Sequence, residues 1–169
     1  AKIIHEMVRA QAQLVEDMLD VSRAKTGKLT VERQLLPFTF LIADSIGALR
    51  REAERKNITL DVQIAEEPLI VAADPVRVRQ IAWNLLSNSL KFTPTGGAVR
   101  VSLQRDRADA RLEIEDTGVG IAPDRLPYLF DWFRRAEPSS GTGGGMGIGL
   151  ALVHQLVELH GGRLEAHSE

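Results

Sequence analysis

The sequence predicts an α+β domain with two layers, in which helices cover one face of a mixed sheet. Segments in which apolar and polar residues alternate, as in strands, are separated by segments with helical periodicity. Two of the alternating segments, 99–103 and 110–115, are joined by a short polar turn, which predicts an antiparallel hairpin. Because strands and helices are interspersed along the chain, we expect one sheet with the helices packed on one of its faces.

Composition limits the possible functions. The chain has 169 residues and a net charge of −2, with charged residues spread along it, which argues against a nucleic-acid-binding protein. It contains no cysteine, so neither disulfides nor thiolate chemistry is expected. No apolar run approaches the ~20 residues of a membrane span, and no secretory signal is visible. We therefore expect a cytoplasmic domain, attached to a membrane only through segments outside this chain.

The first element is a long helix, predicted over residues 2–25. Its heptad seam is formed by Ile4, Met7, Gln11, Leu14, Met18 and Val21. Such a seam predicts packing against a partner helix in a dimeric bundle, in which Gln11 would set the register. The alternative is a helix packed on its own globular domain. Gly27 is the expected C-terminal cap.

The remaining elements follow in order. Strands are predicted at 29–35, 58–64, 69–72, 99–103, 110–115 and 163–167, and helices at 39–56, 75–91, 122–130 and 147–160. Pro37 is expected to break the first strand. Asp74 and Pro75 give the strongest helix start, because an aspartate N-cap is often followed by proline at the first helical position.

Polar side chains lie on one face of the predicted helix 75–91. Asn84, Asn88 and Lys91 are spaced so that they share this face, whereas the apolar residues lie on the others. Two carboxamides and an ammonium group could hold a magnesium ion and its phosphates, because a carboxamide oxygen is a hard ligand. The alternative is an exposed polar face without a ligand.

Two glycine-containing segments could complete such a site. Asp116 is followed by Gly118 and Gly120, and the acid can accept a hydrogen bond from an exocyclic amine. The run 141–149 is rich in glycine and leads into a helix, whose N-terminal N–H groups favour phosphates. The alternatives are a turn at a strand end for the first segment and a flexible linker for the second.

Together these segments resemble the motifs of bacterial sensor histidine kinases, in the Bergerat (GHKL) ATPase superfamily. Residues 84–93 resemble the N box of that family, 116–120 its first glycine box, 129–133 its phenylalanine box and 145–150 its second glycine box. The resemblance covers the whole chain. It implies a Bergerat-type fold, a two-layer α/β sandwich preceded by the long helix.

The resemblance also implies roles for individual residues. Asp116 would bind the adenine amino group, in a pocket shaped by Gly118, Gly120 and Ile121. Asn88 would bind the magnesium ion with Asn84 beside it, and Lys91 would meet the phosphates or the ribose. Residues 131–146 would form a lid anchored by Phe130 and Phe133. The remaining nucleotide-binding residues would be Arg135, for the terminal phosphate, and Gly145, Gly147, Gly149 and Leu150 of the second glycine box.

The chain departs from the family at both ends. His5 lies in a partial match to the phospho-acceptor motif, but no proline follows, and the helix continues into a sequence that resembles the end of the second hairpin helix. We therefore expect residues 1–26 to be part of that second helix, without an acceptor histidine. Residues 27–169 would be the catalytic domain, lacking its last strand. Three further histidines are expected to be surface or packing residues: His154, His160 and His167.

The function implied is that of the ATP-binding part of a two-component histidine kinase. With ATP and Mg²⁺ as cofactors, such a protein transfers the γ-phosphoryl group to a histidine and then to an aspartate of a response regulator. It would form a homodimer through the first helix and follow an upstream sensor domain. Without an acceptor, this chain should not autophosphorylate. The alternatives are a pseudokinase or dimerisation module and an anti-sigma-type serine kinase of the same superfamily.

Overall fold

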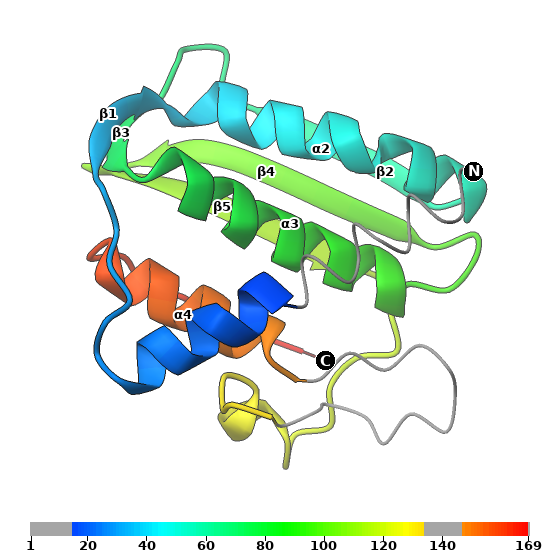
Figure 1. The fold of residues 1–169 in the computed structure, drawn as a ribbon. Coiled ribbons are helices and arrows are strands. Elements are labelled where there is room, and N and C mark those ends of the chain that lie inside the picture. The colour runs from blue at the N-terminus through cyan, green and yellow to red at the C-terminus, as the bar shows by residue number, and fades with distance from the viewer. Residues whose placement is uncertain (1–14, 134–146, 169) are drawn as a thin grey trace, which may run out of the picture.

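The computed structural model describes residues 15–133 and 147–168 and confirms the predicted α+β class (Figure 1). Two long helices lie side by side over one face of a sheet, and a shorter helix lies beside them. The elements are a helix ending at residue 25, β1 (Gln34–Pro37), α2 (Phe38–Arg55), β2 (Thr59–Ile64), β3 (Ile70–Ala73), α3 (Pro75–Phe92), β4 (Ala98–Asp106), β5 (Asp109–Asp116), the 3₁₀ turn η1 (Leu126–Tyr128) and α4 (Gly149–Leu159). No helix within these ranges is long and apolar enough to cross a membrane.

The main sheet has the strand order β2-β4-β5 and is mixed, as predicted. β2 pairs with β4 in parallel, and β4 and β5 form the predicted antiparallel hairpin. β1 and β3, however, form a separate antiparallel ribbon, so the expectation of a single sheet was wrong. The reason is that β1 runs directly into α2 and β3 reaches α3 after one residue, which fixes the ribbon at the starts of these helices.

The core lies between the main sheet and the helices α2 and α3. The central strand β4 alternates as predicted, with Val99, Val101 and Leu103 almost completely buried. The two helices cover this face with buried apolar stripes: Leu41, Ile42, Ile46, Leu49 and Ala53 from α2, and Val78, Ala82, Leu86 and Leu90 from α3. Each of the larger side chains stabilises the fold by about 1.5–3 kcal/mol on burial. The sheet therefore fixes α3 firmly along its length.

Three predicted elements differ in the structure. The first strand is Gln34–Pro37 instead of 29–35, because Leu29 packs against α4 instead of joining a sheet. Pro37 closes this strand instead of breaking it, which an edge strand tolerates. The predicted helix 122–130 is only the turn Leu126–Tyr128, because Pro127 cannot continue a helix.

The predicted strand 163–167 is not formed in the structure. Its residues alternate in exposure, as the sequence pattern requires, but they join no strand ladder among the described residues. A strand needs a neighbour whose backbone groups complete its hydrogen bonds, and periodicity alone cannot supply one. The end of the segment is joined to the turn after β5, because the backbone N–H of Ile121 donates to the Ser168 hydroxyl at 2.8 Å.

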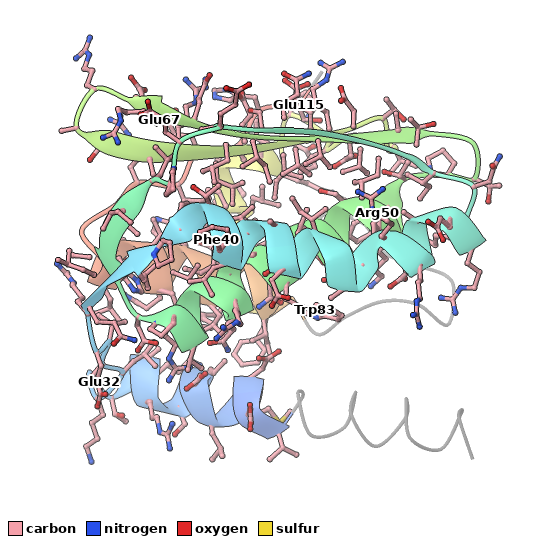
Figure 2. The ribbon with its side chains drawn as sticks, turned by 90° about the horizontal axis from the view of Figure 1, so that it is seen from above. Glu32, Phe40, Arg50, Glu67, Trp83 and Glu115 are labelled. Atoms are coloured by element: carbon pink, nitrogen blue, oxygen red, sulfur yellow. The ribbon has the colours of Figure 1, made fainter. Side chains whose placement is uncertain are left out.

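The N-terminal helix packs on the outer side of α3 and α4, away from the sheet (Figure 2). It ends as predicted at Gly27, whose φ of +66° closes the helix while Lys28 N–H donates to Arg23 O at 2.8 Å. Val21, which was expected on the dimer seam, is buried against the same chain, whereas Met18 is exposed. Ile4, Met7, Gln11 and Leu14 lie outside the described residues.

Asp74 caps α3 as predicted and also connects it to two other segments. Its carboxylate accepts from the N–H groups of Val76 (2.9 Å) and Arg77 (3.2 Å), and from Glu32 N–H (3.0 Å). Its own N–H donates to Nε2 of His160 at the end of α4 (3.0 Å). Burial alone would raise the pKa of Asp74, but the N–H donors of Glu32, Arg77 and Val76 outweigh it and hold the pKa below its ordinary value.

We predict that Asp74→Ala destabilises the fold by about 1–2 kcal/mol, as loss of an N-cap does. Asp74→Asn keeps the cap but loses the charge, so it should cost less. Because the folded-state pKa lies below 3.8, the extra stability of the wild type over Asp74→Asn should be complete above pH 3.8 and disappear as the pH falls through the folded value. Urea denaturation across this range measures it; a constant difference would contradict the account.

Candidate functional site

The predicted polar face of α3 meets the start of α4. Gly149 opens α4 so close to α3 that a Cβ at this position would lie 2.8 Å from Oδ1 of Asn84 and 4.0 Å from Nδ2 of Asn88. The Asn84 side chain is oriented by a hydrogen bond from its Nδ2 to Gln80 O at 3.1 Å. The structure therefore brings the N-box residues and the second glycine box together. Both asparagines are half-buried.

The start of α4 differs from that of α3. The N-cap residue of α4, Ile148, makes no side-chain capping hydrogen bond, whereas the side chain of Asp74 caps the start of α3. Backbone N–H groups in the first turn of a helix have no partner within the helix and favour anions. Gly147, with φ +69°, makes the turn that leads into α4, and its carbonyl accepts from Phe133 N–H at 2.9 Å. Leu150, in the first turn, is half-buried.

The first glycine box forms a tight turn at the end of β5. The exposed Asp116 accepts from Gly118 N–H through Oδ1 at 2.9 Å. A Cβ on Gly118 would lie 2.5 Å from that oxygen and 2.9 Å from the carbonyl of Phe92 at the end of α3. Only glycine allows this approach, so the turn sits directly against the N box. Gly120 follows with φ +70°, and Ile121 is half-buried.

Lys91 is exposed in the last turn of α3, with its Nζ 5.2 Å from the ring centroid of Phe92. Lys56, which follows α2, caps the C-terminal end of α3, because its Nζ donates to Leu90 O at 2.5 Å. Lys91 follows Asn84 and Asn88 at helical spacing, so it lies on the side of α3 that carries the asparagines. Arg135, Gly145 and most of the predicted lid 131–146 lie outside the described residues.

The histidines have structural contacts. The ring of His154 stacks on Phe130, with centroids 5.2 Å apart, so Phe130 anchors the end of the phenylalanine box to α4. His160 is held at both ring nitrogens, since Nδ1 lies 2.7 Å from Leu156 O and Nε2 accepts from Asp74. His167 is exposed. This agrees with the prediction that these three are packing or surface residues.

Sequence reasoning missed a polar cluster between the N-terminal helix and α3. Asp17 and Asp20 are buried and contact Arg77 and Gln80. Asp17 and Asp20 are three residues apart and so share one side of the helix, but the arginine that pairs with Asp20 lies 57 residues further along the chain, and local sequence does not reveal it.

The polar groups of the described site are of the kinds that bind a nucleotide and its metal ion. It offers an exposed carboxylate at Asp116, carboxamides at Asn84 and Asn88, and an uncapped helix start at Gly149. Because an amine, a hard cation and an anion are the natural partners of these three groups, they fit the adenine, the metal ion and the phosphates of one ligand.

Comparison with known proteins agrees with this arrangement. Residues 73–169 match the family described as histidine kinase-, DNA gyrase B-, and HSP90-like ATPase. The chain belongs to this family. The matched range contains both asparagines, Asp116 and the second glycine box.

Several relatives of this ATPase domain are histidine kinases. The circadian input-output histidine kinase CikA of Synechococcus elongatus is 36% identical over 170 residues, which cover 99% of this chain and 22% of CikA. Among solved structures, the mycobacterial sensor histidine kinase MprB is similar (TM-score 0.65, 34% identity, 77% of this chain and 81% of that one). Full-length ShkA, solved with AMPPNP, is also similar (TM-score 0.76, 28% identity, 95% of this chain and 33% of that one). The chain thus spans about a fifth of CikA.

We predict that Gly149→Ala destabilises the ATPase domain, because the added methyl group would collide with Asn84. The matched control is Gly47→Ala in the middle of α2, where an added Cβ meets nothing within 4 Å. That change should instead stabilise by about 0.5–1 kcal/mol, through helix propensity. Thermal unfolding compares the two variants.

Combining Gly149→Ala with Asn84→Ala tests the cause of the loss. Removing the carboxamide should recover part of the stability lost in the single glycine variant, because the two sites are in contact. Purely additive losses would show that the collision with Asn84 is not the cause.

Proposed function

We propose that this chain is the ATP-binding catalytic part of a two-component sensor histidine kinase. The observation that carries the proposal is the convergence of Asn84 and Asn88 with Gly149, at the end of α3 where Gly118 also packs. Three segments that are far apart in sequence are thereby assembled into one set of ligand-binding groups. The histidine kinases among the relatives support this reading over a serine kinase or a module without transfer activity.

The residues would share the nucleotide as follows. Asp116 would accept from the adenine amino group, beside Gly118, Gly120 and Ile121. Asn88 would hold Mg²⁺ with Asn84 next to it, and the ion would neutralise phosphate charge. Lys91 and the N–H groups at Gly147, Gly149 and Leu150 would face the phosphates. Arg135 would reach the terminal phosphate and Gly145 would contribute to the second glycine box, as the family resemblance implies.

The acceptor would be a histidine outside the described residues. Within those residues, His154 is stacked on Phe130 and His160 has both ring nitrogens engaged. His167 is exposed but lies in a segment with no helix around it. The phosphoryl group would therefore pass to a histidine on a helical hairpin of the intact protein, and then to an aspartate of a response regulator. Because ATP is the donor, we place the domain in the cytoplasm.

The N-terminal helix is suited to join this domain to a dimer. Asp17, Asp20 and Val21 face the domain, whereas Val15, Met18 and Leu19 are each more than half exposed on the opposite side. We propose that residues 1–26 belong to the second hairpin helix and that this outer side meets the helices of a second copy. Residues 27–169 are then the catalytic domain, downstream of a sensor domain.

Replacing Asp116 tests the nucleotide site. Asp116→Ala should weaken ATP binding about 10- to 100-fold, the value of a hydrogen bond to a charged group. Asp109→Ala, at the other end of the same strand, is the matched control and should leave affinity unchanged. Isothermal titration calorimetry measures both; equal affinities would exclude Asp116 from the site.

Radiolabelled ATP tests the absence of an acceptor. The chain incubated alone with [γ-³²P]ATP and Mg²⁺ should acquire no acid-labile label, because no histidine is in the family's acceptor context. Label mapped to His5 would contradict the assignment of residues 1–26.

A further inference from the structure

The end of α3, the start of β4 and the end of β5 meet at one end of the main sheet (Figure 1). Asp116 is the last residue of β5 and pairs with Val99 of β4. Thr117 follows it and stays bound to Ala98. Its backbone N–H donates to Ala98 O at 3.0 Å, and its Oγ1 accepts from Ala98 N–H at 2.9 Å and lies 3.4 Å from Ala98 O.

The hydroxyl of Thr117 takes the place of a backbone carbonyl in this pair. Two residues in a hydrogen-bonded pair of an antiparallel ladder donate their N–H groups to each other's carbonyls. Here one of these bonds is present, and the other goes to the Thr117 side chain. The chain can therefore leave the ladder directly after Asp116 and turn at Gly118, whose N–H donates to Asp116 Oδ1 at 2.9 Å.

Gly97 connects Thr117 to the end of α3. A Cβ at Gly97 would lie 2.5 Å from Cγ2 of Thr93 and 2.8 Å from Oγ1 of Thr117, so its backbone is packed between the two side chains. Thr93 is 3% exposed and closes α3, because its Oγ1 donates to Ser89 O at 2.7 Å. We call Thr93, Gly97 and Thr117 the threonine clamp. It joins the end of the N box to the first glycine box.

The clamp orients Asp116 more strictly than the other contact between these two motifs. The packing of Gly118 on the carbonyl of Phe92 limits only how closely the turn approaches α3. The bonds of Thr117, in contrast, are directional. Thr117 is itself exposed, so water can bond to Ala98 if the hydroxyl is removed. The fold should then survive, but the turn that carries Asp116 would be held by one bond fewer.

We propose that Thr117 is a positioning residue that makes the site selective for a purine with an exocyclic amine over one with an oxygen at the same place. It acts through Asp116, since it fixes the turn in which Oδ1 is bound to Gly118 N–H and Oδ2 is directed to the amine. The inference rests on the proposed function, which assigns adenine to Asp116. A purine with a carbonyl oxygen there would place two acceptors against each other.

Calorimetric titration of the whole chain with ATP and with ITP, both with Mg²⁺, measures this selectivity. ITP has a carbonyl oxygen in place of the adenine amine and the same ribose and phosphates. Wild type should bind ATP at least about tenfold more tightly than ITP, the value of one hydrogen bond to a charged group. Thr117→Val keeps the branched shape without the hydroxyl. It should weaken ATP binding about three- to tenfold and change ITP binding less than about threefold, so the ratio of affinities falls.

Three further variants test the cause. Thr117→Ser keeps the hydroxyl and should keep the ratio, whereas Thr95→Val, exposed in the loop before β4, is the matched control and should change nothing. Gly97→Ala should lower the ratio, because its methyl group would press on Thr117. Adding Thr93→Ser removes the other methyl group in its way and should recover part of the loss. Circular dichroism shows that each variant is folded.

The amide proton of Gly118 reports on the Asp116 carboxylate without any nucleotide, because it is bound to Oδ1. Its NMR resonance should shift, and its exchange with solvent should become faster, in Thr117→Val but not in Thr117→Ser. The effect of Mg²⁺ on ATP affinity should stay as in wild type in both variants, since Asn84 and Asn88 are unchanged. A general loosening of the domain would alter this effect as well.

The outcomes separate the two proposals. If folded Thr117→Val keeps either the wild-type ratio of affinities or the wild-type Gly118 resonance, the positioning role is overturned. A fall in the ratio together with an altered effect of Mg²⁺ would also overturn it. A fall in the ratio with a shifted resonance and an unchanged effect of Mg²⁺ confirms it. A folded wild-type chain that binds neither nucleotide would instead overturn the proposed function, and the Gly118 resonance would still decide whether Thr117 positions the carboxylate.

Discussion

Helix α3 has to fit three neighbours at once, and the rest of the structure depends on how it does so. Its apolar side packs in the same core cluster as β4, where Val99 and Val101 are fully buried. Its polar side meets the N-terminal helix at one end and Gly149 at the other. Because one rigid helix carries both contacts, the placement of the nucleotide residues is linked to the packing of the whole domain.

The candidate site forms because the backbone at two glycines comes close to α3. Gly149 leaves room for the Asn84 carboxamide, and Gly118 lets the turn after Asp116 lie against the carbonyl of Phe92. A Cβ at position 149 would displace the Asn84 carboxamide, and a Cβ at position 118 would push the β5 turn away from the carbonyl of Phe92. The glycines therefore have a steric role in assembling the site, in addition to the phosphate contacts that the family resemblance implies.

Much of this arrangement could be predicted from local sequence. The Asp74 cap, the extent of α2 and α3, the hairpin and the shared face of Asn84 and Asn88 all follow from periodicity and capping. Contacts between distant segments could not be predicted in this way. Leu29 alternates like a strand residue but is buried by α4, and Asp20 resembles a surface acid until Arg77 is placed beside it. The prediction of a strand at 163–167 was wrong for the same reason. An alternating pattern shows which residues share a face, but it does not show which strand pairs with them.

The central claim is that α3, α4 and the end of β5 together hold ATP with its metal ion. Calorimetric titration of the folded chain with ATP, with and without Mg²⁺, tests it most directly. The account predicts saturable binding at one site per chain that is tighter when Mg²⁺ is present. A folded chain that gives no binding heat at any temperature, with or without Mg²⁺, would contradict it.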